Sequence, residues 1–171
     1  MSSAIVSIER VRQPLAEIKF DEVRSSPAKR ALLTAKLLSE KPVKSDERLA
    51  EWNFGELEGC LITDAIARYP REMFTSRNDL VHFDGSIFGA ESVSSVLARF
   101  DELANELISS RFENVLLVGH GASGTAGIRH LAGFPVGELR SGGGLGNNTV
   151  TILEYINGKF HLLVWNKSYD E

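Results

Sequence analysis

Apolar residues recur along the chain with the spacings of an α/β protein. From residue 4 to residue 18 they follow a 4-3-4-3 spacing, which places them on one stripe of a helix. A second helix is predicted over 28–38, because Pro27 stands where a first helical turn accepts proline. A longer apolar stripe predicts a helix from Val93 to Ile108.

Short β-rich runs alternate with these helices. Strands are predicted at Phe20–Val23, at Val43–Asp46 as a sheet edge, and at Val115–Val118. The last run is apolar throughout and ends at Gly119, which is typical of a strand buried on both faces. A helix is predicted to follow it from about Ser123 to Leu131.

The remaining segments complete the architecture. Thr149–Ile156 and Lys159–Trp165, joined by Asn157-Gly158, predict a β-hairpin. Residues 52–90 are richer in glycine, aromatic and polar residues, with one brief helix predicted near Ile62–Tyr69. We interpret 52–90 as a surface excursion of one domain spanning 1–171. The order of elements predicts an α/β fold with a mostly parallel central sheet.

Composition and charge exclude several classes of function. The net charge of −4, with acidic and basic residues mixed along the chain, argues against a nucleic-acid-binding surface. Apolar runs stay well below the ~18 residues that a membrane-spanning helix needs. The single cysteine, Cys60, cannot form an internal disulfide, and we expect a buried or half-buried thiol. We expect a cytoplasmic protein with no metal site and no cofactor.

The first candidate site lies at Arg24-Ser-Ser-Pro-Ala-Lys-Arg30, where a predicted strand gives way to a helix. Backbone N–H groups at a helix N-terminus attract anions, and the guanidinium of Arg30, one turn inside, can bind phosphate oxygens bidentately. A capped helix start with solvated basic residues explains the same pattern. Spacing alone leaves both interpretations open.

The second candidate is His120, between two glycines at the end of the predicted strand Val115–Val118. Ligands of open α/β sheets bind at the carboxyl ends of the strands, which favours a functional histidine over a structural one. The run Gly119–Gly124 also spells G-x-G-x-x-G, so a dinucleotide-binding domain is a further hypothesis. It fits poorly, because the 47 residues after Gly124 are mostly hairpin rather than further βαβ units.

The third candidate is Glu51, which stands beside Trp52 in a loop punctuated by Gly55 and Gly59. A glutamate next to an aromatic ring can have its pKa raised by desolvation and can act as a general acid. A solvated acidic loop is the simpler interpretation of this motif taken alone. Arg68, Arg71 and Arg77 hint at an anionic substrate, although exposed loop arginines commonly serve solubility only.

Five motifs in fixed order resemble the histidine phosphatase (phosphoglycerate mutase-like) superfamily. They are Ser-Ser-Pro-x-x-Arg-x-x-x-Thr-Ala at 25–35, Leu-Ala-Glu at 49–51 with Gly55 and Glu58-Gly59, Gly-Ala-Glu-Ser at 89–92, the run 115–121, and Asn148–Tyr155. The resemblance implies a three-layer α/β sandwich and a metal-independent hydrolase that transfers phosphate through a phosphohistidine. A phosphatase acting on a small phosphorylated metabolite is favoured over a phosphomutase.

The resemblance also implies residue roles. Arg30 matches the second arginine of the family, Glu51 the proton donor and His120 the second histidine. Ser26 and the backbone around Gly121 and Ala122 would complete the phosphate pocket. Glu91 would support the substrate or the arginines of the pocket.

One motif of the family is not found in this sequence. The family's first central strand ends in Arg-His-Gly, whose histidine is the nucleophile, and these 171 residues contain no such tripeptide. His82, His130 and His161 do not follow an N-terminal strand. We therefore expect the first central strand to be missing or replaced. Four alternatives remain open: a family enzyme whose chain is incomplete in these 171 residues, a reorganised enzyme, a strand borrowed in a homo-oligomer, and a catalytically silent relative that binds phosphorylated ligands or a protein.

Overall fold

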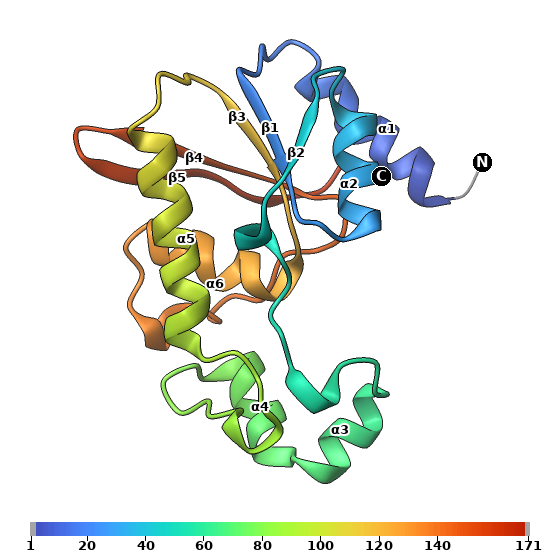
Figure 1. Ribbon diagram of the computed structural model, residues 1–171, viewed down its shortest axis with the longest axis vertical. Helices are drawn as coiled ribbons and strands as arrows, with labels where there is room; N and C mark the ends of the chain where they lie inside the picture. The colour runs from blue at the N-terminus through green and yellow to red at the C-terminus, as the bar shows by residue number, and fades with distance from the viewer. Residues whose placement is uncertain (1–2, 170–171) are drawn as a thin grey trace.

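A short parallel sheet organises the protein. The computed structural model, which describes residues 3–169, places β1 (Glu22–Ser25) between β2 (Val43–Ser45) and β3 (Val115–Val118), with all three strands parallel (Figure 1). Val23 lies opposite Val43 on one side and opposite Leu116 on the other. The α/β fold with a parallel sheet is thereby confirmed, and β2 is the edge strand that the sequence predicts.

The described residues form six α-helices. They are α1 (Ser3–Leu15), α2 (Lys29–Leu38), α3 (Ile62–Arg68), α4 (Pro70–Asn78), α5 (Val93–Ile108) and α6 (Gly121–Leu131). The helix predicted over 4–18 ends three residues earlier, and α6 begins two residues before its predicted start. The helix predicted over 28–38 forms with Ala28 as its N-cap residue, so Pro27 precedes the helix rather than opening it.

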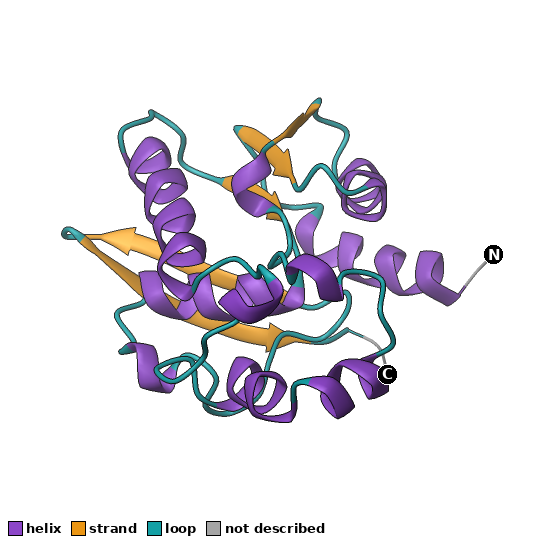
Figure 2. Ribbon diagram, turned by 60° about the horizontal axis from the view of Figure 1, so that its bottom comes forward, coloured by secondary structure: helices purple, strands orange, loops and turns teal. Residues whose placement is uncertain are grey.

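The two faces of β1 meet different partners. Side chains alternate along a strand, and Val23 packs with Ala31 and Ala35 of α2. Arg24, on the opposite face, forms an ion pair with Glu106 of α5. Helices α1 and α2 therefore lie on one side of the sheet and α5 on the other (Figures 1 and 2).

The predicted hairpin forms β4 (Val150–Ile156) and β5 (Lys159–Lys167), which pair antiparallel. Asn157 and Gly158 both have positive φ, 53° and 79°, as the tight turn requires. The hairpin is a separate two-stranded sheet, so the single mostly parallel sheet that we expected is divided in two.

Strand β3 is less covered than its sequence predicts. Among the described strands it pairs with β1 alone, which leaves one edge of β3 without a partner strand. Leu117 is 39% exposed although the run 115–118 is entirely apolar. The prediction that this strand is buried on both faces is wrong for the described residues. The absence of a first central strand stays a prediction.

The segment 52–90 contributes to the largest core of the described protein. It contains two α-helices, α3 and α4, where the sequence predicted one. Its buried side chains, among them Trp52 and Phe88, form one cluster with Phe100 of α5. Helix α6 approaches α5 so closely that a Cβ at Gly127 would lie 2.3 Å from the ring of Phe100, so only glycine fits there.

A network of ion pairs joins β1, β2 and α5. Arg24 contacts Glu22, Asp46 and Glu106 at 2.9, 3.1 and 2.7 Å, and Arg48 contacts Asp46 and Glu106 at 2.7 Å each. Hydrogen bonds from Arg48, opposed by burial and helped by Arg24, lower the pKa of Asp46 to about 2. The charged side chains on this face of β1 are thus paired with oppositely charged side chains. The apolar periodicity of the sequence does not reveal these partners.

We predict that Asp46→Asn lowers the free energy of unfolding at pH 7 by about 2 kcal/mol. This is the free energy that corresponds to lowering the pKa of Asp46 from 3.8 to about 2 on folding. Because the folded-state pKa is depressed, this stabilisation is present above pH 4 and is lost as the pH falls towards 2. Urea unfolding of the wild type and the variant at pH 7 and pH 2.5 measures it. Asp64→Asn, at an exposed position of α3, is the control. A stability difference of equal size at both pH values would contradict the prediction.

Candidate functional site

The carboxyl ends of β1 and β3 bring the first two candidate motifs together. The N–H of Ser26 donates to the carbonyl oxygen of Val118 at 2.9 Å, one residue beyond the last register pair of the two strands. Ser26 and His120 therefore leave the sheet at the same edge, where ligands of parallel α/β sheets bind.

Three of the predicted site residues meet at this edge. Nη2 of Arg30, from the first turn of α2, lies 3.1 Å from Nδ1 of His120, and Nε2 of His120 lies 2.7 Å from Oγ of Ser26. A guanidinium has no acceptor, so Nδ1 must accept from Arg30 and the proton of the neutral ring lies on Nε2, which donates to Ser26. Arg30 is exposed and Ser26 is buried, so the cluster runs from the surface into the domain.

The surroundings of His120 favour its neutral form. Burial lowers the pKa of His120 below its ordinary value, the carboxylate of Glu51 acts against this, and the charges of Arg30 and Arg99 lower the pKa further. The Nδ1 lone pair faces a cation in this state. An oxyanion between the two side chains would accept from Arg30 and, once His120 is protonated, from the ring as well.

Glu51 is held by the N-terminus of α6. Its Oε1 accepts from the N–H groups of Ser123 (2.7 Å) and Trp52 (2.8 Å), and its Oε2 accepts from the N–H of Ala122 (3.1 Å). Burial raises the pKa of Glu51, but these backbone hydrogen bonds lower it more, and the net shift is downward. Our expectation of a raised pKa is therefore wrong for this state, because the aromatic neighbour is outweighed by three amide donors.

Glu91 acts on the site through an arginine that the sequence did not single out. Its carboxylate accepts from Nε and Nη2 of Arg99 at 2.9 and 3.2 Å. Arg99 in turn donates to the carbonyl oxygens of Arg48 and Glu51. Glu91 thus fixes the backbone that carries Glu51. The available sequence signal was a glutamate just before a predicted helix, with an arginine eight residues further along the chain.

A cavity of about 500 Å³ begins at Glu51, Gly121 and Ala122 and extends to the segment 52–90. Arg77 and Arg140 line it, whereas Arg30 and His120, which are in direct contact, lie outside its lining. Cys60 is exposed at this cavity, so the expected burial of its thiol is wrong. The cavity therefore adjoins the Arg30–His120 cluster on the side of the glutamate.

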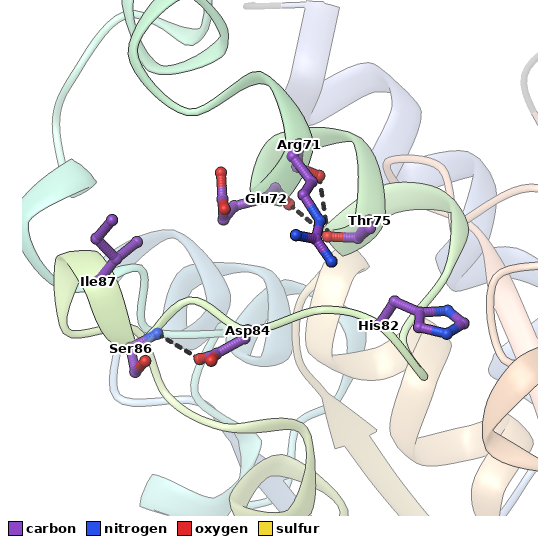
Figure 3. Close-up of a pocket in the computed structure, with 7 residues that line it drawn as sticks. All are labelled: Arg71, Glu72, Thr75, His82, Asp84, Ser86 and Ile87. Atoms are coloured by element: carbon purple, nitrogen blue, oxygen red, sulfur yellow. Dashed lines mark hydrogen bonds between the residues drawn. The ribbon is translucent and has the colours of Figure 1, made fainter.

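A smaller cavity of about 260 Å³ lies between α4 and the loop that follows it (Figure 3). Arg71 and Thr75 line one side, and Asp84, Ser86 and Ile87 line the other. Arg71 is one of the arginines that hint at an anionic substrate, but none of the residues assigned to catalysis or phosphate binding lines this cavity. It is a separate feature of the excursion.

Two further properties of the described chain bear on the sequence predictions. The described residues contain no group of three or more histidine, cysteine, aspartate or glutamate side chains placed to hold a metal ion. Over the same residues, no helix has the length and apolarity to cross a membrane.

We predict that the affinity for sulfate, a dianion from pH 5 to 8, rises as the pH falls. The free histidine has a lowered pKa and a bound dianion favours its charged form, so binding takes up a proton. Calorimetric titration should show an increase of about tenfold per pH unit at most. His120→Gln should remove the pH dependence, whereas His161→Gln, at an exposed position of β5, should keep it. A pH-independent wild-type affinity would contradict the prediction.

Comparison with known proteins places this chain in a family. The family model of the histidine phosphatase superfamily (branch 1) matches residues 4–168. The chain is 30% identical to the glucosyl-3-phosphoglycerate phosphatase of Mycobacterium tuberculosis, over 92% of this chain and 75% of the relative. It is 29% identical to the putative phosphoserine phosphatase 2 of Hydrogenobacter thermophilus, over 71% of this chain and 60% of the relative.

A solved structure agrees with these matches. The mycobacterial glucosyl-3-phosphoglycerate phosphatase in complex with inorganic phosphate superposes with a TM-score of 0.85 and 28% identity, covering 96% of this chain and 86% of that chain. These matches are to phosphatases, and they give no support to the dinucleotide-binding hypothesis for the run Gly119–Gly124. The chain belongs to the histidine phosphatase superfamily, branch 1.

Proposed function

We propose that this domain hydrolyses phosphomonoesters of small metabolites by transferring the phosphoryl group to a histidine and then to water. The observation that carries the proposal is the contact of Arg30 with Nδ1 of His120 at the carboxyl edge of the sheet. A fork of N–H donors and a histidine there match the oxygens of a phosphoryl group. The phosphatases among its relatives support the same class of reaction.

Each residue has a role in this scheme. Arg30 and protonated His120 bind the nonbridging oxygens, and Ser26 orients the ring of His120 from the other side. Glu51 lies where the cavity begins, beside Gly121 and Ala122, and exchanges the proton of the leaving oxygen or of the attacking water. Its lowered pKa makes the ionised carboxylate the resting form, so it must first take up a proton to serve as an acid.

The scheme needs a nucleophilic histidine, and these 171 residues do not contain the Arg-His-Gly tripeptide that carries it in the family. We propose that a strand carrying this tripeptide pairs with the free edge of β3. A parallel strand at that edge would end beside the ends of β1 and β3, within the same ligand-binding edge as His120. The partial exposure of the apolar residue Leu117 supports such a partner.

A second function fits the same geometry. His120 contacts both Arg30 and Ser26 without any nucleophile, and this cluster would bind a phosphorylated ligand without turning it over. A catalytically silent relative would keep this cluster and lack the transfer step. A measurement of phosphate-ester hydrolysis distinguishes an active phosphatase from a relative that only binds the ligand.

We predict that the 171-residue chain hydrolyses p-nitrophenyl phosphate no faster than its His120→Ala variant, because without a nucleophile the binding groups cannot form the covalent intermediate. Release of p-nitrophenol at pH 5 to 8 measures this. An extension that carries an in-frame Arg-His-Gly segment from upstream of the Met1 codon should raise the rate by about 10³-fold or more.

The outcomes distinguish the alternatives. If the 171-residue chain alone hydrolyses the ester and His120→Ala abolishes this activity, a histidine of this chain is the nucleophile. That result would refute the proposal of an added strand. An extended chain that binds phosphate but stays inactive would identify a silent relative.

A further inference from the structure

The hydroxyl of Ser123 is a buried polar group that the scheme above leaves without a role. Ser123 is fully buried, and its Oγ is a buried side-chain atom that has no hydrogen-bond partner among the described residues. Thr125 is buried to the same degree, but it donates its hydroxyl to the carbonyl oxygen of Gly121 at 2.6 Å. Burying a hydroxyl without a partner is unfavourable, so a serine at this position needs a physical reason.

The place of Ser123 in α6 supplies that reason. Ser123 is the third residue of the helix, and its N–H donates to Oε1 of Glu51 at 2.7 Å. Because Oγ is joined to the same Cα through a single carbon atom, the hydroxyl lies beside the carboxylate that the N–H binds. Burial raises the pKa of Glu51, backbone N–H groups lower it, and the Ser123 hydroxyl lowers it further, as a nearby donor does.

The two carboxylate oxygens of Glu51 are held differently. Oε1 accepts from the N–H groups of Ser123 and Trp52, which occupy both of its lone pairs in this structure. Oε2 accepts from the N–H of Ala122, and one of its lone pairs stays free. Ala122 lines the cavity of about 500 Å³, whereas Ser123 does not. Oε1 is therefore the anchored oxygen, and Oε2 is the oxygen available for a proton.

The Ser123 hydroxyl differs from these N–H donors because it can move. An N–H group is fixed by the backbone, whereas a hydroxyl turns about the Cα–Cβ bond. Proton transfer to a bound substrate brings the carboxyl group of Glu51 towards the cavity, and this movement lengthens the hydrogen bonds from the fixed N–H groups. The hydroxyl can follow Oε1 during that movement.

Charged side chains do not hold the Glu51 carboxylate in the described structure. The titratable and charged groups around it come from other elements, and they are Glu58, Arg77, Arg99, His120 and Arg140. None of these described side chains forms an ion pair with the carboxylate, and its three hydrogen bonds come from backbone N–H groups. The ionised state of Glu51 therefore depends on neutral donors, and the Ser123 hydroxyl is of this kind.

We propose that Ser123 is a positioning residue for Glu51: its hydroxyl turns towards the carboxyl group and donates to Oε1, so that Oε2 exchanges the proton with the substrate. Ser123 neither gains nor loses a proton, because the proton passes between Oε2 and the leaving oxygen or the attacking water. The catalytic consequence rests on the proposed phosphomonoester function, whereas the hydrogen bond does not.

Unfolding equilibria of the 171-residue chain in urea test the hydrogen bond. We expect Ser123→Ala to raise the unfolding equilibrium constant at least about tenfold at pH 7, because a donor to an ionised carboxylate is lost. The pKa of Glu51 is lowered in the folded protein, so this effect is fully present above its ordinary value of 4.5. The effect should fade as the pH falls from there towards 3.

Two further variants isolate the contact with Glu51. In a Glu51→Met background, which offers the hydroxyl no acceptor, Ser123→Ala should change the unfolding equilibrium constant less than about twofold at pH 7. Ser76→Ala is the matched control, because Ser76 is also buried and donates its hydroxyl to the carbonyl oxygen of Met73 at 2.9 Å. Its effect should depend neither on pH nor on Glu51.

The results separate this inference from the function on which it rests. A Ser123→Ala variant at least as stable as the wild type at pH 7 shows that the hydroxyl is unpartnered in solution and overturns the proposal. A loss of equal size at pH 7 and pH 3, or one that persists with Glu51→Met, reflects packing alone and also overturns it. Wild-type protein that fails to bind sulfate in a calorimetric titration overturns the proposed function and, with it, the catalytic consequence, but not the hydrogen bond.

Discussion

The parallel pairing of β1 with β3 is the constraint on which the site depends. Ser25 lies opposite Val118, and the hydrogen bond from Ser26 to Val118 extends the ladder by one residue. Because the strands are parallel and in this register, Ser26 and His120 leave the sheet side by side, and the first turn of α2 brings Arg30 to them. A register shift of one residue would turn these side chains to opposite faces.

The N-terminus of α6 provides the second fixed element. Its first N–H groups attract a negative charge, and in this structure Glu51 supplies that charge. The glutamate is held in turn by a backbone that Arg99 and Glu91 fix. One helix terminus thus determines both the position of the proton-transfer group and its ionised state, and it links that group through Ala122 to Arg140.

The sequence predicted the local elements and the cluster well, and the long-range electrostatics poorly. Periodicity located α5 and β3, and the turn residues located the hairpin, because these signals are local. The family resemblance assigned Arg30 and His120 to one phosphate pocket, and the structure places their side chains in contact. Their roles in phosphate binding stay predictions.

Most of the failed predictions concern contacts between distant segments of the chain. The pKa of Glu51 depends on amides some 70 residues away, and Arg99 and Arg140 act through backbone carbonyls of distant segments. Such partners leave no periodic signal in the sequence. Helix α4 was missed because it follows α3 directly at Pro70 and lacks a clear apolar stripe, and the exposure of β3 depends on which strands pair with it.

The central claim is that the Arg30–His120 contact is a phosphoryl-binding site. The most direct measurement is a crystal structure of the 171-residue chain with tungstate, whose anomalous scattering locates the oxyanion without ambiguity. We expect one strong tungsten peak, with tungstate oxygens within hydrogen-bonding distance of both the Arg30 guanidinium and the His120 ring and with the 3.1 Å contact between these side chains opened. Tungstate bound only elsewhere, with the Arg30–His120 contact intact, would contradict it.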